Sequence, residues 1–170
     1  MKKVLLFLLL LVSVQTFAQI RRTAVFDFTN PTALNPSITP EPENAQNVMV
    51  TDKVFKNLGV NISFNAIGQY PIGARIQTSV ISGETSYFLK LASISDMTFG
   101  VANGATLNEI RFSEETIFGG LYLKDGEAGT MNPYETYKKW EAGNSTSVSS
   151  VTFRNTDKDS HFLKIYVTYT

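Results

Sequence analysis

Hydrophobic and polar residues alternate along most of the chain, in short runs. In the run 24–29, Phe26 and Phe28 fall on one side of an extended chain, whereas Val25 and Asp27 fall on the other. Alternation with a period of two predicts a β-strand that buries one face. Sustained spacing of three or four residues, the pattern of an amphipathic helix, is rare. The pattern therefore predicts an all-β protein with the two Phe side chains of the first strand in the core.

The same alternation recurs along the chain and predicts roughly nine or ten strands. The further runs are 60–64, 75–79, 87–91, 97–101, 108–112, 119–123, 151–153 and 163–169. Clusters of Gly, Asn, Ser and Asp separate them, as is typical of turns. This number and spacing of strands favour two packed antiparallel sheets. The predicted fold is a two-sheet antiparallel β-sandwich of the jelly-roll kind, formed as a single domain by residues 19–170.

The segment 30–44 interrupts this rhythm because it holds four of the six prolines, Pro31, Pro36, Pro40 and Pro42. Proline has no amide hydrogen for a strand ladder and restricts the residue before it, so a central strand is excluded. The segment is predicted to form an ordered arch after the first strand. It is interpreted as a stiff connection across one end of the sandwich, with a ligand-binding arch as the alternative.

A second interruption, at 132–143, carries signals for one short helix near 133–142. Asn132 suits an N-cap, Pro133 the first helical position and Gly143 the position after the last turn. The competing prediction is an extended loop that leads to a strand at Trp140.

The same stretch suggests a candidate ligand site. On a helix, Tyr134, Tyr137 and Trp140 would form one aromatic stripe, flanked by the amides of Asn132 and Asn144. Such a stripe could stack on sugar rings, or it could seal the end of the hydrophobic core. Exposure of the rings distinguishes the two interpretations.

The first residues predict export. Lys2 and Lys3 precede an apolar stretch at 4–14, which is too short for a membrane-spanning helix of about 20 residues. Thr16 and Ala18 provide small residues before a cleavage site, so residues 1–18 are predicted to be a signal peptide. An uncut anchor helix is the alternative. The chain has no Cys for a lipid anchor, so we expect the mature protein to be secreted or periplasmic and free of the membrane.

Composition limits the choice of partners. Removal of Lys2 and Lys3 with the signal peptide leaves 13 basic and 15 acidic residues, a formal charge of −2. Nucleic acids and anionic membranes are bound through many Lys and Arg contacts, so neither is expected as a partner. A glycan or another exported protein is the expected partner.

The residues offer little for catalysis or metal binding. The only histidine, His161, lies beside Asp159 and Ser160, too close in sequence for a catalytic triad. With no Cys and one His, a zinc site is disfavoured and no cofactor is expected. Asn155, Asp157 and Asp159 are weak candidates for calcium, because oxygen ligands in a loop suit that ion. The same residue types also form ordinary polar turns.

Three stretches resemble exported jelly-roll domains of Bacteroidota secreted proteins. They are 25–31, with the sequence VFDFTNP, then Trp140 with the Gly143-Asn144 turn and the strand 147–153, and the closing 163–169, LKIYVTY. Domains of this type are similar to galactose-binding-like and carbohydrate-binding modules. The resemblance implies a β-sandwich that binds carbohydrate, and it assigns no binding residue.

Two main hypotheses for function follow, with a third behind them. The first is a non-catalytic, exported module that binds carbohydrate through the aromatic stripe. The second is a structural or protein-interaction component of the periplasm or cell surface. The third is a glycan hydrolase with an unrecognised carboxylate pair, which would need two carboxyl groups facing each other at a set distance. The adjacent Glu114 and Glu115 would point apart on a strand, whereas Asp27 with Asp52 and Glu109 with Glu127 stay open as pairs.

Overall fold

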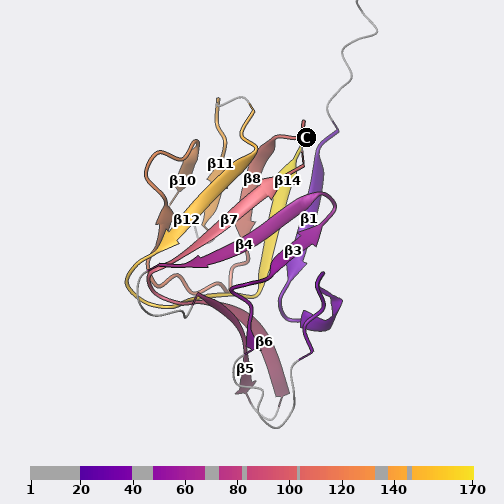
Figure 1. Ribbon diagram of the computed structural model, residues 1–170, viewed down its shortest axis with the longest axis vertical. Coiled ribbons are helices and arrows are strands. Elements are labelled where there is room, and N and C mark those ends of the chain that lie inside the picture. The colour runs from indigo at the N-terminus through magenta and orange to yellow at the C-terminus, as the bar shows by residue number, and fades with distance from the viewer. Residues whose placement is uncertain are drawn as a thin grey trace, which may run out of the picture.

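A computed structural model describes residues 20–39, 48–67, 73–81, 84–102, 104–132, 138–144 and 147–170. These residues form fourteen β-strands and one 3-10 turn, and every strand pairing among them is antiparallel (Figure 1). The prediction of an all-β antiparallel fold is confirmed. The strands are β1 (Arg22–Asp27), β2 (Val48–Met49), β3 (Val54–Asn57), β4 (Val60–Ala66), β5 (Ala74–Ile81), β6 (Glu84–Leu91), β7 (Ser95–Val101), β8 (Leu107–Phe112), β9 (Leu121–Leu123), β10 (Thr130–Asn132), β11 (Lys139–Glu141), β12 (Ser150–Asn155), β13 (Ser160–Phe162) and β14 (Lys164–Tyr169).

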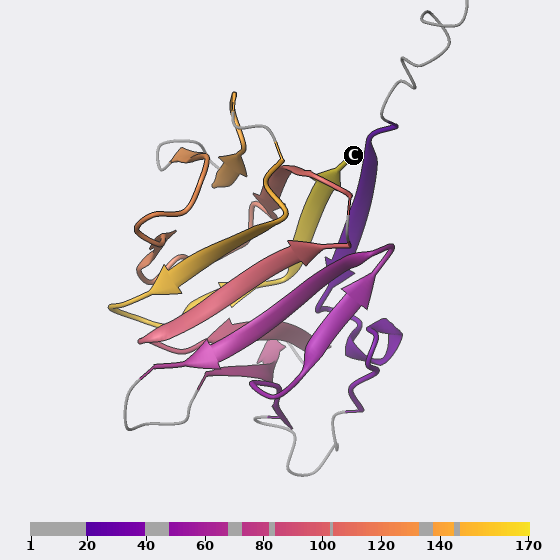
Figure 2. The same cartoon turned by 45° about the horizontal axis from the view of Figure 1, so that its top comes forward.

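The strands form three sheets. The first sheet has the order β1-β14-β8-β11-β10, the second β3-β4-β7-β12-β9 and the third β13-β6-β5-β2. The first two sheets face each other as the layers of a sandwich, as Figure 2 shows. The third sheet extends from one end of the sandwich, where the β5–β6 hairpin projects (Figure 1).

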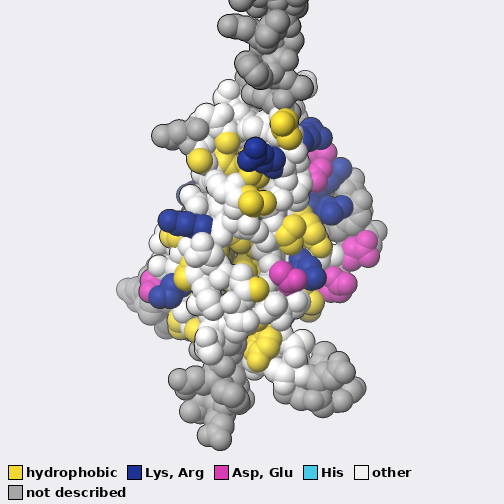
Figure 3. Space-filling view, turned by 90° about the vertical axis from the view of Figure 1, so that its right-hand side faces the viewer, with side chains coloured by type: hydrophobic (Ala, Val, Ile, Leu, Met, Phe, Trp, Pro, Cys, Tyr) yellow, Lys and Arg dark blue, Asp and Glu magenta, His cyan; other side chains and the backbone are white. Residues whose placement is uncertain are grey.

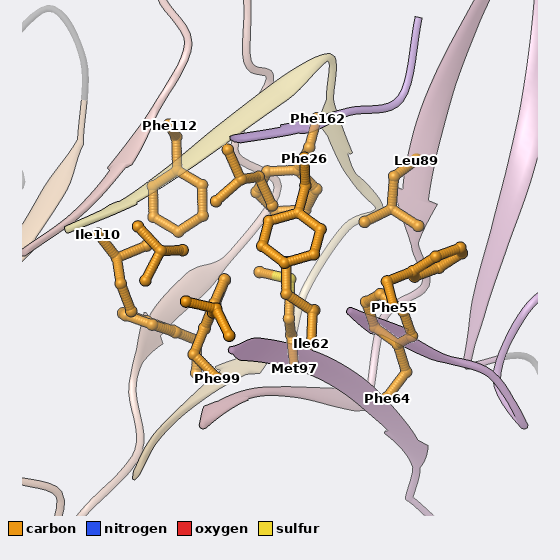
Figure 4. Close-up of a cluster of buried hydrophobic side chains, with 14 of the residues drawn as sticks. Phe26, Phe55, Ile62, Phe64, Leu89, Met97, Phe99, Ile110, Phe112 and Phe162 are labelled. Carbon is orange, nitrogen blue, oxygen red and sulfur yellow. The ribbon is translucent and has the colours of Figure 1, made fainter. Parts of the chain in front are cut away.

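The core lies where the three sheets meet, and Phe112 of β8 contacts the other two. Its ring packs against Phe99 and Phe153 of the second sheet, with centroids 6.5 and 5.8 Å apart, and against Phe162 of the third sheet at 5.3 Å. Figure 4 shows Phe112 and Phe162 approaching the core from one side and Phe99 from the other. Fully burying a side chain of this size contributes about 1.5–3 kcal/mol, so this cluster is a main source of stability.

Alternation along the strands explains which faces are buried. In β1, Phe26 is 1% exposed and the following Phe28 is fully buried, while Val25 is 38% exposed. In β4, Val60, Ile62 and Phe64 are buried and the residues between them are not. The predicted core face of the first strand is confirmed.

The proline-rich segment after β1 begins with a 3-10 turn at Pro31–Ala33. The amide of Ile38 donates to the Pro31 carbonyl at 3.0 Å, and the amide of Lys56 in β3 donates to the Asn35 carbonyl at 2.6 Å. The part of the predicted arch up to residue 39 therefore packs against β3. Pro40 and Pro42 lie outside the described residues.

The helix predicted near 133–142 is wrong over its last residues, because Lys139–Glu141 is a strand, β11. It pairs with β8 on one side and β10 on the other. Pairing on both sides satisfies its backbone, and the extended chain sends Trp140 inward between two polar neighbours, which outweighs local helix signals. The competing prediction of a strand at Trp140 is confirmed, and residues 133–137 lie outside the described part of the chain.

Candidate functional site

Trp140, the last residue of the predicted aromatic stripe, is not available to a ligand. Trp140 is 0% exposed, and its neighbours across the strands are Ile110 and Met131. The indole Nε1 donates a hydrogen bond to the Ala128 carbonyl at 2.9 Å. For Trp140 the interpretation that it seals the hydrophobic core is therefore confirmed and the interpretation that it stacks on a ligand is wrong, because the side chain is part of the core and its hydrogen-bond donor is already used.

The other members of the predicted site fall in different places. Tyr134 and Tyr137 lie outside the described residues, and so does the side chain of Asn132, the last residue of β10. Asn144 is exposed in the turn after β11. It lines a polar depression of about 350 Å³ at one end of the first sheet, together with Arg21, Asn108, Thr130, Glu141, Ala142 and Gly143.

Strand register brings a row of four side chains together on the outward face of the first sheet. Tyr166 of β14 lies opposite Val25 on one side and Arg111 on the other, and Arg111 lies opposite Lys139. Val25, Tyr166 and Arg111 each lie between two buried neighbours, and Lys139 precedes the buried Trp140, so the four form one row across the sheet on the face turned away from the core. The Arg111 guanidinium carbon lies 4.8 Å from the centre of the Tyr166 ring.

A second depression lies beside this row. Its volume is about 250 Å³, and it is lined by Arg111, Phe112, Ser113, Glu114, Glu115 and Tyr166. This shallow depression therefore combines an aromatic ring, a guanidinium, a hydroxyl and two exposed carboxylates. Glu141 of the first depression lies two residues from Lys139 on β11, and Lys139 is opposite Arg111 of the second depression, so both depressions open on the same face of the sheet.

Ion pairs hold the rest of this face in place. Lys164 Nζ lies 2.9 Å from Asp27 Oδ2, and Lys139 Nζ lies 3.2 Å from Glu141 Oε1. Partial burial raises the pKa of Asp27, but hydrogen bonds from Thr29 and Lys164 outweigh it and bring the pKa below its ordinary value. The Asp27 carboxylate is thus engaged within the protein.

A third depression, of about 430 Å³, lies at the edge of the sandwich between β1, the 3-10 turn and β3. Its lining combines apolar side chains such as Leu34 and Leu58 with polar ones such as Asn35 and Lys56. The side-chain amide of Asn57 donates a hydrogen bond to the Val25 carbonyl at 2.7 Å, so it occupies a backbone acceptor on the outer edge of β1. The predicted arch forms one wall of this depression.

The calcium candidates do not converge on one point. The Asn155 amide nitrogen donates to the carbonyls of Leu91, Ala92 and Lys158 at 3.2, 3.0 and 2.7 Å. Asp159 Oδ2 lies 2.6 Å from Lys90 Nζ, and Asp157 is exposed. Within the described residues no group of three His, Cys, Asp or Glu side chains could hold a metal. This geometry is that of a hydrogen-bonded polar turn.

The carboxylate pairs considered for hydrolysis also lie in different settings. Asp27 is paired with Lys164, while Asp52 lies in an exposed turn beside Lys53. Glu109 is on the outward face of β8, and Glu127 follows the turn after β9. Glu114 and Glu115 are both exposed at the second depression.

Three carboxyl groups have a pKa that is shifted in the wrong direction for a catalytic acid. The pKa is lowered at Asp27, Asp96 and Asp159, since hydrogen bonds and nearby cations outweigh the effect of burial. A glycosidase acid needs a raised pKa instead.

Comparison with protein families, curated proteins and solved structures finds no match. Among the described residues there is no helix long and apolar enough to cross a membrane. Arg111 and Tyr166 were not singled out from the sequence. The alternation in 163–169 does place Tyr166 on the outward face, but only the register between β8 and β14 brings Arg111 to it.

Proposed function

We propose that the chain is an exported, non-catalytic module that binds an extended glycan across the outward face of the first sheet. The observation that carries this proposal is the presence of two shallow polar depressions on this one face, with Tyr166 in one and Asn144 in the other. Small-molecule sites combine a concave surface with a few polar groups that fix orientation. The carboxylates, amides and hydroxyls of this face suit the hydroxyl groups of a sugar, and the Tyr166 ring offers an apolar surface edged by a hydroxyl.

The proposal moves the site from the predicted stripe to a neighbouring face. Asn144 is retained from the sequence-based site, and Tyr166 takes the place that Trp140 cannot fill. A ligand in contact with both depressions would lie along β8, whose outward residues connect them. Export through the signal peptide at 1–18 is part of the same proposal, because the extended glycan that we propose as the ligand would be encountered outside the cytoplasm.

Affinity electrophoresis of the purified domain in gels that contain soluble polysaccharides tests the proposal. We expect at least one polysaccharide to retard the protein, and Tyr166→Ala and Asn144→Ala to weaken this retardation. Tyr122→Ala is the matched control, because Tyr122 is 39% exposed on the second sheet. Retardation by no polysaccharide across a broad panel, or equal retardation of Tyr166→Ala and the wild type, would reject the site.

A second candidate function, binding of another protein, is favoured by the edge at which β1 and β3 lie. Ile20, Val25, Val54 and Leu58 are exposed there to 72%, 38%, 41% and 66%. Figure 3 shows hydrophobic side chains interspersed with charged ones on this side of the molecule. Exposed apolar side chains that cluster on one surface mark interaction sites. Light scattering of the wild type and of Leu58→Lys would reveal self-association through this edge, and a monomer at all concentrations would count against a homomeric contact.

A further inference from the structure

The outward face of the third sheet brings three basic side chains into one row. Register places Lys90 of β6 directly opposite Arg75 of β5 on one side and His161 of β13 on the other. The residues adjacent to them, such as Ile76 and Leu89, are buried in the core, so the three point to the other face. His161 also forms a bridge with Ile117, which extends the row.

The charges in this row are not balanced. Like charges directly opposite each other on neighbouring strands destabilise a sheet. One carboxylate counters them, since Asp159 Oδ2 lies 2.6 Å from Lys90 Nζ and its other oxygen accepts the Ser93 amide at 3.1 Å. In the described residues no ion pair is formed by Arg75. Among the described side chains, two permanent cations therefore share one carboxylate.

The Arg75 side chain is also short of hydrogen-bond acceptors. Its Nε is buried and has no hydrogen-bond partner within the described structure. A charged donor that is removed from water without an acceptor destabilises the folded state. Sites that keep such a cost often use it for a ligand, and the planar guanidinium is suited to two parallel hydrogen bonds with an oxyanion.

We propose that Arg75 and Lys90 form a binding site for an oxyanion, the carboxylate or sulfate group of an acidic ligand. The guanidinium would take the two oxygens that face it, and Lys90 would share its ammonium between the ligand and Asp159. The site is on a different sheet from the proposed glycan face, so either proposal can fail without the other.

His161 makes anion binding at this site depend on pH, and its own titration reports on that binding. Its ring packs against Phe88 with centroids 4.7 Å apart. Burial lowers the pKa of His161, Lys90 and Arg75 lower it further, and Asp159 acts in the opposite direction. A bound anion would partly cancel the two cations and so raise this pKa. By linkage, protonation of His161 would strengthen anion binding as the pH falls.

The experiment is a pH titration of the imidazole proton signals of His161 by NMR, which is simple to assign because the chain has one histidine. Spectra are recorded in sodium chloride, sodium sulfate and sodium glucuronate at matched ionic strength, with glucose as a neutral control. We expect sulfate or glucuronate to raise the pKa of His161 relative to chloride, and glucose to leave it unchanged. A response to both anions indicates a general oxyanion site, whereas a response to glucuronate alone indicates an acidic sugar.

Variants separate binding from general screening. Arg75→Gln is expected to weaken the anion response by about tenfold in concentration, and Lys90→Gln to weaken it as well. Lys56→Gln, on β3 of the second sheet, serves as the matched control with full response. Circular dichroism verifies that each variant is folded. Equal pKa values in chloride, sulfate and glucuronate, or a full response in folded Arg75→Gln, would overturn the proposal.

Discussion

The Trp140 indole is joined to the Ala128 carbonyl by a hydrogen bond of 2.9 Å. This contact attaches the turn before β10 to the core strand β11. It also consumes the one polar group of a ring that is 0% exposed. The side chain that looks most like a sugar platform in the sequence is therefore a structural element, and its role is to close one end of the sandwich.

The buried position of Trp140 predicts its fluorescence. Because it is the only tryptophan of the chain, the native protein should emit at short wavelength, and acrylamide should quench it poorly. Unfolding in urea should shift the emission to longer wavelength and restore quenching. The unfolded protein serves as the control. Quenching of the folded protein to the same extent as the unfolded one would contradict the burial of this ring.

Gly129 provides a second test of the same contact. Its φ of +91° is in the left-handed region, and an added Cβ would overlap Trp140 Nε1 and the Glu141 carbonyl. Gly126 has a similar φ of +84° with nothing within 4 Å of an added Cβ. We expect Gly126→Ala to lower the free energy of unfolding by about 1 kcal/mol from backbone strain alone. Gly129→Ala should cost about 3 kcal/mol, because overpacking adds to that strain. Equal urea midpoints for the two variants would mean that the Trp140 packing is not as described.

The sequence predicted the longer strands because each carries enough alternating residues to show a period of two. β4, β7, β8 and β14 all correspond to runs that were recognised in this way. β10, β11 and β13 have three residues each, which is too short for periodicity to be visible. Near β11, capping residues suggested a helix, and pairing with β8 and β10 decides against it.

The candidate sites depend on register, which the sequence does not express. Alternation alone places Tyr166 and Arg111 on outward faces, but their contact requires the pairing of β14 with β8. The row of Arg75, Lys90 and His161 likewise requires the β5–β6 hairpin to pair with β13, which is distant in the sequence. The amino-acid types indicated which functional groups the chain carries, and the sheet topology determines which of these groups lie close together.

Asp96 should make stability depend on pH in the acid range. Its side chain is 7% exposed, and Arg154 donates to both of its oxygens at 2.8 and 3.0 Å. Burial raises the pKa of Asp96, but the hydrogen bonds from Arg154 and Lys124 outweigh it and bring the pKa below the ordinary value. The unfolded state therefore binds the proton first, so this stabilisation is complete above the ordinary pKa. It is lost as the pH falls through the lower pKa of the folded state.

Urea unfolding from pH 7 down to acid pH measures this contribution. Asp96→Asn should reduce the free energy of unfolding at pH 7 by about 2 kcal/mol, the usual value for hydrogen bonds to a charged group. It should also flatten the acid dependence, with Asp27 and Asp159 responsible for the remaining slope. Asp52→Asn is the control, because the Asp52 side chain is 75% exposed. An acid slope as steep in Asp96→Asn as in the wild type would contradict the role of this carboxylate.

Asn155 distinguishes a hydrogen-bonded turn from a calcium site. Its amide nitrogen faces three carbonyl oxygens, and its Oδ1 accepts the hydroxyl of the buried Ser160 at 2.8 Å. In Asn155→Asp a carboxylate would face those carbonyls with no donor, so we expect a loss of about 3 kcal/mol in the free energy of unfolding. Asp157→Asn, in the exposed part of the same turn, should change it by less than about 0.5 kcal/mol.

Calcium itself completes this test. A ligand that binds only the folded state raises the melting temperature, and the rise increases with the logarithm of the ligand concentration once this exceeds Kd. Because the Asn155 amide is occupied by backbone carbonyls and Asp159 by Lys90, millimolar calcium should leave the melting temperature of the wild type unchanged. The same holds for Asp157→Asn, and magnesium serves as the control for ionic strength. A calcium-specific rise that disappears in Asp157→Asn would show that the turn rearranges to bind the ion, and the hydrogen-bonded geometry of Asn155 would then describe only the metal-free state.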